Sequence, residues 1–295
     1  MSVQVSDTPA PAAARGAVLD GLLRLVREPL GLLGLTLVVL VTIGALGADV
    51  LTDYSPIKLA VRDRFLPPSA AHLLGTDQLG RDLFTRVLHG ARIALWVALV
   101  ATGIAFAGGL VLGMIAGYGP RWLDSILVLL FDAVRSFPTV MFALALVTLI
   151  GPSLGAVVLV VVIVSMPGYA RVVRAQTMAL KTSEFVLSTR ALGATAPRIL
   201  RVHILPNIVG PLLILASMDI PVVITIEAGM SFLGLGVRPP TPSWGAILND
   251  GFAFIRESPW PAIAGGLPII LATLGFTFLG ETLRDQLDPR LRSKE

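Results

Sequence analysis

Six long apolar stretches are the feature that most constrains what this sequence can fold into. They cover residues 30–48, 93–118, 123–150, 156–173, 208–233 and 261–283. Each is close to or above the roughly 20 residues with which a helix crosses the hydrocarbon core of a bilayer. Because backbone polar groups inside lipid must be satisfied within the segment, these stretches predict helices. The expected fold is all-α: a polytopic membrane helical bundle with six transmembrane helices.

The composition supports a membrane protein and excludes several kinds of site. Charged residues make up 14% of the chain and hydrophobic residues 55%, whereas soluble proteins carry about 25% charged residues. So few charges would leave a water-exposed surface largely apolar. The sequence has no cysteine, which excludes disulfides, thiolate zinc sites and cysteine nucleophiles.

The apolar stretches also divide the chain into segments. Residues 1–28 are expected to form a disordered cytoplasmic tail, and 29–91 the first transmembrane helix with an external loop. Residues 92–284 form the predicted transmembrane domain, which includes a cytoplasmic polar loop at 174–207. Residues 285–295 are the expected cytoplasmic C-terminal tail.

The distribution of basic residues predicts the orientation in the membrane. With a cytoplasmic N-terminus, fourteen Lys and Arg fall in inside segments and eight in outside segments. Inside loops of membrane proteins carry the excess of Lys and Arg, so both termini are expected to be cytoplasmic. The basic residues form no dense block, and nucleic acid is therefore not an expected partner.

One predicted helix carries a row of small residues at every fourth position. Such a row lets a second helix approach closely, because no side chain holds the two backbones apart. The row predicts a tightly packed pair inside the bundle. Its members are Ala101, Ala105, Gly109, Gly113 and Gly117.

The sequence contains no convincing motif for catalysis, nucleotide binding or metal binding. No Gly-Lys pair occurs, so a phosphate-binding loop of the Walker A type is missing. A formal Gly-x-Ser-x-Gly match at 151–155 lies between two apolar stretches, where Pro and Gly favour a turn. His72, His89 and His203 lack the spacing of metal ligands. We therefore expect no catalytic residue, no metal site and no cofactor bound by this chain.

The polar loop at 174–207 is the most informative segment outside the apolar stretches. Gly193 separates two short pieces compatible with helix and suits a positive φ. Pro197 favours the first turn of the second piece, and Pro206 is expected to end it. Such a short amphipathic helix either docks into a groove of a partner protein or lies on anionic lipid. The residues alone leave both alternatives open.

Four ionisable residues fall within the predicted spans. Asp132 and Arg135 are three apart and are expected to pair on one helical face, while Asp219 and Glu227 lie in the fifth span. A charge at the centre of a bilayer costs at least about 2.5–3.5 kcal/mol, so such groups usually face the bundle interior or a water path. All four are candidates for the transport pathway, with structural pairing as the alternative.

Four sequence segments are similar to known motifs in the same order. They are HLLGTDQLGRDLFTR at 72–86, RALGA with HILP at 190–194 and 203–206, SFLGLGVRPPTPSWGA at 231–246 and GETLRDQLDPRLRS at 280–293. These segments resemble the permeases of ABC importers for dipeptides, oligopeptides and nickel, and the third and fourth resemble the C-type subunit. At the positions where the general importer pattern has Glu-Ala-Ala, this chain has Leu187, Ser188 and Thr189.

The resemblance implies the transmembrane domain of a type I ABC importer in the bacterial inner membrane. It implies a heterodimer with a second permease subunit, two ABC ATPase subunits that bind Mg-ATP, and an external solute-binding protein. Dipeptides, oligopeptides or a related small solute would cross by alternating access, with lipid around the bundle. The expected ATPase-coupling residues are Arg190, Ala191, Leu192, Gly193, Ala194, Pro197 and Arg198.

An ion-coupled secondary transporter is the alternative function. It would run on protons or sodium through Asp132, Asp219 and Glu227. Such a carrier has no evident need for the polar loop at 174–207, which therefore favours the ATP-driven importer. A membrane-embedded enzyme would need a convergent set of nucleophile, base or metal ligands that the sequence does not show.

Overall fold

The computed structural model describes residues 25–287, and this part of the chain is helical without β-strands. The tails predicted at 1–28 and 285–295 lie mostly outside the described residues. The elements are α2 (Pro29–Leu46), α3 (Ala48–Leu51), a 3₁₀ turn (Val61–Asp63), α4 (Leu83–Tyr118), α5 (Arg121–Arg135), α6 (Thr139–Ile150), α7 (Leu154–Lys181), α8 (Glu184–Ala191), α9 (Ala196–Arg198), a π-helical turn (Ile199–Ile204), α10 (Leu205–Phe232), α11 (Trp244–Ala253) and α12 (Trp260–Leu287).

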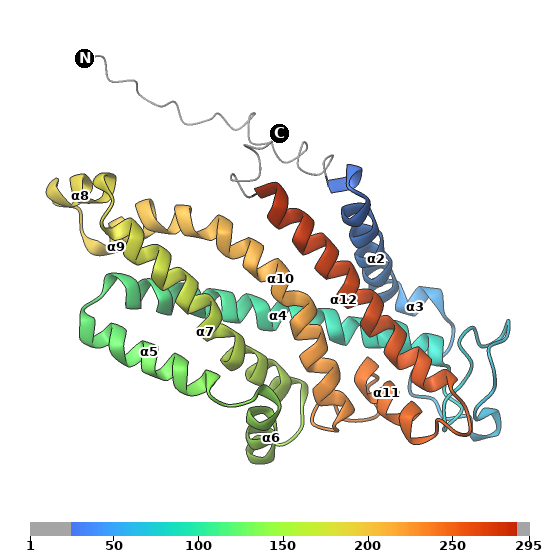
Figure 1. Ribbon diagram of the computed structural model, residues 1–295. Helices are drawn as coiled ribbons and strands as arrows, with labels where there is room; N and C mark the ends of the chain where they lie inside the picture. The colour runs from blue at the N-terminus through green and yellow to red at the C-terminus, as the bar shows by residue number, and fades with distance from the viewer. Residues whose placement is uncertain (1–24, 288–295) are drawn as a thin grey trace.

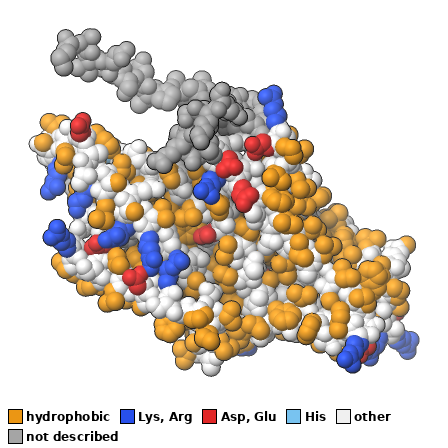
Figure 2. Space-filling model, in the orientation of Figure 1, with side chains coloured by type: hydrophobic (Ala, Val, Ile, Leu, Met, Phe, Trp, Pro, Cys, Tyr) orange, Lys and Arg blue, Asp and Glu red, His pale blue; other side chains and the backbone are white. Residues whose placement is uncertain are grey.

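Five helical segments are long and apolar enough to cross a membrane. They are α2, α4, α7, the continuous segment Ala196–Phe232 and α12. In Figure 1 these helices lie alongside one another as a slanted bundle, with α11 and the 52–82 segment at one end and α8 at the other. Apolar side chains cover most of the face in Figure 2, and the charged groups gather toward its ends. This distribution is the one that a lipid-facing surface requires.

The sixth predicted span, 123–150, is not one straight helix. It consists of α5 and α6, whose axes meet at 92° across a break of a few residues. Pro138 stands at the N-cap of α6. Because a proline has no N–H and disfavours helical geometry at the residue before it, the helix ends at Arg135 and restarts at Thr139. The bundle therefore has six crossings only if the bent pair counts as one.

The row of small residues on α4 lies in a closely packed helix pair, as predicted, and the structure identifies the partner as α7. A Cβ added to Gly109 would lie 2.4 Å from the Cβ of Tyr169, and one added to Gly113 would lie 2.5 Å from the carbonyl oxygen of Ala170. Such distances leave no room for a side chain. The α4–α7 pair is thus held at backbone-to-backbone distance by these glycines.

The same device joins the first and last helices. A Cβ on Gly34 of α2 would lie 2.9 Å from the carbonyl oxygen of Gly275 on α12. On the side of α2 away from α12, Leu40 and Ile43 are more than half exposed. One side of α2 therefore packs on the bundle while the other presents the apolar surface that lipid would cover.

Several helices extend beyond the predicted spans. The first external loop was expected to reach residue 91, but α4 begins at Leu83 because Asp82 caps it: Asp82 Oδ2 accepts the backbone N–H of Thr85 at 2.8 Å. At the C-terminal end, α12 continues past the predicted boundary at 284. Ser153 in the Gly-x-Ser-x-Gly match caps α7 by accepting the N–H of Ala156 at 3.1 Å. This confirms that the match is a turn.

Candidate functional site

The segment predicted as a polar loop at 174–207 is mostly helix. α7 runs on to Lys181, whose Nζ donates to the carbonyl of Tyr118 at 2.8 Å. After α8, the helix that begins with α9 continues through the π-helical turn into α10. The prediction that Pro206 ends this helix was wrong. The π-helical turn immediately before it accommodates the missing N–H, as local π geometry does in membrane helices.

Gly193 ends α8 in the manner that its sequence position predicts. Its φ is +85°, its N–H donates to the carbonyl of Arg190 at 3.0 Å, and the N–H of Ala194 donates to the carbonyl of Thr189 at 3.3 Å. These two bonds form a Schellman motif, which requires a left-handed residue after the helix. Pro197 then lies in the first turn of α9, as predicted.

The predicted coupling residues are placed at the surface of this turn. Ala194 is half-buried, and the other six are exposed: Arg190, Ala191, Leu192, Gly193, Pro197 and Arg198. Leu192 is 89% exposed, which is unusual for a large apolar side chain at the tip of a turn. The turn borders a depression of about 440 Å³ that is also lined by Thr189, Thr195 and His203.

Buried side chains hold this exposed turn against the bundle. Val186 of α8 packs in one apolar cluster with Ile199 and Ile204, and the cluster includes Tyr169 and Val173 of α7. The free face of α8 carries Phe185 and Leu187, each nearly half exposed. One face of α8 is therefore packed against the bundle, and its opposite face is apolar and exposed.

The expected pair between Asp132 and Arg135 does not form. Arg171 of α7 binds the Asp132 carboxylate instead, because α7 packs alongside α5. One turn further along α5, Arg135 lines a different space with Asp219 of α10. Two pathway candidates are therefore brought together, and Asp132 is not among the residues that line that space.

This space, the α5–α10 cavity, has a volume of about 500 Å³. It is lined by Val134, Arg135, Phe137, Thr139, Val164, Ser165, Gly168, Tyr169, Val172, Leu215, Asp219, Val222 and Ile226. Cavities of 300–1,000 Å³ hold small ligands. The sequence reasoning missed Tyr169, whose signal was a single hydroxyl-bearing ring in an otherwise apolar stretch of α7.

Glu227, the fourth pathway candidate, is fully buried and does not line the α5–α10 cavity. Its Oε1 accepts a hydrogen bond from the Ser231 hydroxyl at 2.8 Å, and Oε2 has no partner in the described part of the chain. Glu227 faces the packed interior because α10 lies against α4, α11 and α12 there. The structure supports the structural alternative for this residue.

The segment at 72–86 forms an ionic cluster at the end of the bundle opposite α8. Arg81 Nε lies 2.6 Å from Asp77 Oδ2, and Arg86 Nε lies 3.5 Å from the same oxygen. Arg81 also reaches Asp250 of α11 at 3.5 Å. These contacts fix the external loop onto α4 and α11.

Beside this cluster, α3 is tied to α4 through Asp49. Arg92 Nη2 donates to Asp49 Oδ2 at 2.7 Å. This hydrogen bond holds the pKa of the Asp49 carboxyl below its ordinary value. The end of α2 and the start of the external loop are thereby anchored to the bundle.

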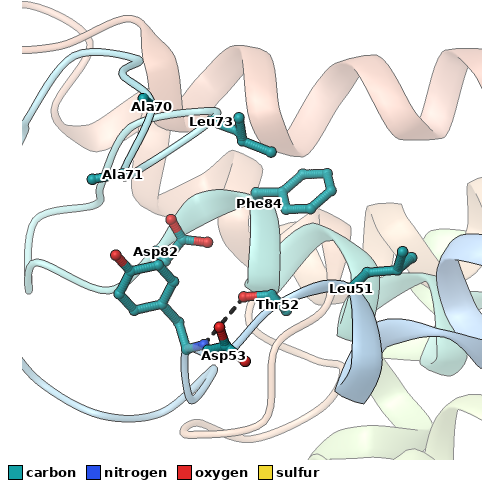
Figure 3. Close-up of a pocket in the computed structure, with 9 residues that line it drawn as sticks. Leu51, Thr52, Asp53, Ala70, Ala71, Leu73, Asp82 and Phe84 are labelled. Carbon is teal, nitrogen blue, oxygen red and sulfur yellow. Dashed lines mark hydrogen bonds between the residues drawn. The ribbon is translucent and has the colours of Figure 1, made fainter.

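A small pocket of about 200 Å³ lies on the same end (Figure 3). Asp53 and Asp82 supply carboxylates to its wall, and Leu51, Leu73 and Phe84 supply apolar surface. The Asp82 carboxylate already has hydrogen-bond partners, because it caps α4 and binds His72 Nδ1 at 2.9 Å. The exposed Asp53 is the carboxylate of this pocket that lacks an ion pair among the described residues.

Comparison with known proteins agrees with this geometry. A family model described as the binding-protein-dependent transport system inner membrane component matches residues 109–293. The dipeptide transport system permease protein DppC of Alkalihalophilus pseudofirmus is 38% identical over 92% of this chain and 89% of its own. The glutathione transport system permease protein GsiD of Pectobacterium atrosepticum is 42% identical over 77% of this chain and 75% of its own.

A solved structure shows the same fold. The chain is similar to one in an inward-facing MetNI methionine ABC transporter, with a TM-score of 0.55 and 19% identity, over 69% of this chain and 97% of the other. The architecture is therefore that of a type I ABC importer transmembrane domain, as the sequence motifs imply. The chain belongs to the family of binding-protein-dependent transport system inner membrane components.

Proposed function

We propose that this chain is one of two unlike permease subunits, the C-type one, of an ATP-driven importer for dipeptides, oligopeptides or a related small solute. Relatives at 38% identity are named as dipeptide and di/tripeptide permeases. The alignment with one of these relatives covers 92% of this chain and 89% of the relative. Peptide transport is therefore the simplest function for this chain. Family membership also favours this function over an ion-coupled carrier.

The observation that carries the proposal is the exposed turn between α8 and α9. Its apolar tip at Leu192 and its basic Arg190 and Arg198 suit a groove on a partner protein. Helix continues without a break from Ala196 to Phe232, so a displacement at the turn is transmitted directly along α10. Docking to an ATPase subunit therefore fits this segment better than passive contact with lipid.

The mechanism follows from this linkage. Two ATPase subunits bind Mg-ATP and supply the hydrolysis, while this chain contributes no catalytic residue. Closure of the ATPase pair moves the α8–α9 turn of each permease and stabilises one of two packed arrangements of the helices. An external binding protein delivers the solute at the end of the bundle that carries α11.

The proposed orientation places both termini in the cytoplasm of a bacterial cell, with the chain in the inner membrane. The start of α2, the end of α12 and α8 lie toward one end of the bundle in Figure 1. The excess of Lys and Arg is expected on that side. Cytoplasmic ATPases would then meet α8 and α9.

The test is co-purification from native membranes in mild detergent, with an ATPase assay on the recovered complex. Gly193→Asp should remove ATP-driven uptake and at least most of the recovered ATPase subunits, because the side chain alters an exposed docking turn. Gly234→Asp is a matched control: Gly234 also has a positive φ, +75°, and open space around its Cβ. It lies beyond the other end of α10.

Loss of the co-purified ATPase subunits in Gly193→Asp with normal recovery in Gly234→Asp supports docking at the α8–α9 turn. Normal uptake coupled to ATP in Gly193→Asp overturns it. Recovery of the wild-type chain without any ATPase subunit would point to the ion-coupled carrier.

A further inference from the structure

The α5–α10 cavity has two charged groups on different walls. Arg135 projects from α5, and Asp219 belongs to α10. The other lining side chains are apolar or neutral, including Val172, Leu215 and Val222. A cavity whose other lining side chains are uncharged thus carries one cation and one anion.

Neither charge is neutralised by an ion pair in the described part of the chain. No carboxylate there lies within 4.0 Å of Arg135, and no basic group lies within 4.0 Å of Asp219; the two charges attract each other only at longer range. The carboxylate nearest to Arg135 in sequence, Asp132, is bound by Arg171. The buried hydroxyl of Tyr169 lies beside Asp219 and interacts with its carboxylate, but it carries no charge that would neutralise the carboxylate. Unpaired charges in a membrane-spanning bundle are costly and normally serve a ligand or a water path.

The chemistry of the two groups selects the ligand. A lone anion would leave Asp219 uncompensated, and a lone cation would leave Arg135 uncompensated. A molecule with an ammonium group at one end and a carboxylate at the other satisfies both through charge-assisted hydrogen bonds. The apolar remainder of the lining accepts side chains of differing shape.

We propose that Asp219 binds the ammonium group and Arg135 the carboxylate of a small zwitterion, such as a free peptide, as it passes through the α5–α10 cavity. This inference rests on the proposed importer function, and it names the solute by its charges. A volume of about 500 Å³ lies within the range for small ligands.

The test measures binding to the complete complex of permeases and ATPases in nanodiscs, without the external binding protein. Radiolabelled alanylalanine is the probe, and unlabelled alanylalanine, its N-acetyl form and its C-terminal amide compete with it. Wild type should bind the free dipeptide roughly tenfold or more tightly than either blocked form, as expected for the loss of one charged hydrogen bond.

Two variants should each lose the preference for the free dipeptide over one of the two blocked forms. Asp219→Asn should lower affinity for the free dipeptide by roughly tenfold and no longer distinguish it from the N-acetyl form. Arg135→Gln should instead stop distinguishing it from the amide. Asp132→Asn, which removes a carboxylate of α5 outside the cavity lining, should keep both preferences. In this crossed pattern each variant stops distinguishing the free dipeptide from a different blocked form. A purely structural role of the two residues would not produce it.

An equal loss for all three competitors in both variants would overturn the proposal and assign the two charges to packing or to the partner permease. Wild-type binding that ignores blocking of either terminus would also overturn it. ATP-driven uptake of alanylalanine by the complex with its binding protein tests the importer function separately. Uptake without the crossed pattern therefore rejects the site alone, whereas a complex that neither binds nor transports any of the peptides rejects the peptide importer as well.

Discussion

Arg174 of α7 forms a bidentate ion pair with Asp124 of α5: Nη2 lies 2.6 Å from Oδ2, and Nε binds the other carboxylate oxygen. Together with Arg171 and Asp132, this pair ties the full length of α5 to α7. α7 leads into α8, and the α8–α9 turn follows α8. The two ion pairs therefore link the bent α5–α6 segment to the element that we propose meets the ATPase.

Breaking the Arg174–Asp124 pair should weaken the α5–α7 contact moderately. Both side chains are about one-quarter exposed, and partly exposed pairs contribute up to about 1 kcal/mol. Arg174→Gln and Asp124→Asn should each lower the thermal midpoint of the purified complex, and the double variant should cost no more than either one. Additive losses in this double-mutant cycle would show that the pair does not stabilise the contact.

Adding a single methyl group at the α4–α7 interface should destabilise the protein. Gly113→Ala places a Cβ 2.5 Å from the carbonyl oxygen of Ala170, and such overpacking costs about 1–3 kcal/mol. Gly103→Ala on the same helix meets nothing within 4 Å and should be neutral or slightly stabilising. Folded yield and thermal midpoint measure the difference. Equal behaviour of the two variants would contradict close packing at Gly113.

The outer ionic cluster should depend on Asp77. Asp77→Asn leaves Arg81 and Arg86 buried, with side chains only 6% and 4% exposed, without their shared carboxylate. Removing one partner of a buried pair costs about 3–5 kcal/mol. Limited proteolysis should then cut the external loop faster than in wild type. Asp53→Asn, at an exposed position of the same loop, should leave the cleavage rate unchanged.

The Ser231 hydroxyl should stabilise the packed end of α10. Ser231→Ala leaves Glu227 Oε1 without its donor inside the bundle, and an unsatisfied buried group costs about 1–3 kcal/mol. Replacing both residues, as Glu227→Met with Ser231→Ala, removes the buried polar groups together and should recover most of the loss. Thermal midpoints of the three proteins decide the matter. A double variant as unstable as the single one would contradict the assignment of the loss to an unsatisfied Glu227 carboxylate.

Patterns that repeat within one helix, or that need one special backbone angle, could be predicted from the sequence. The row from Ala101 to Gly117 marks a closely packed face of α4 because every fourth residue faces the same side of a helix. Gly193 and Pro197 likewise mark the α8–α9 turn, because each suits one local geometry. The apolar stretches identify the helices for the same reason.

Boundaries and partners across helices could not be predicted in this way. α4 and α7 both extend into segments of mixed polarity, since capping by Asp82 and packing against neighbouring helices support turns that apolar length alone does not mark. The break before Pro138 depends on a local signal, but its angle of 92° does not.

By itself, the sequence determined an all-α membrane bundle, the positions of its apolar helices and the sharp turn at Gly193. Only the tertiary structure decided that Asp132 binds Arg171, that Glu227 is buried on Ser231, and that Arg135 and Asp219 line one cavity. The physical reason is that charge pairing depends on which helices pack side by side. The spacing of Asp132 and Arg135 allowed a pair within one helix, but the packing of α7 against α5 supplied a different partner.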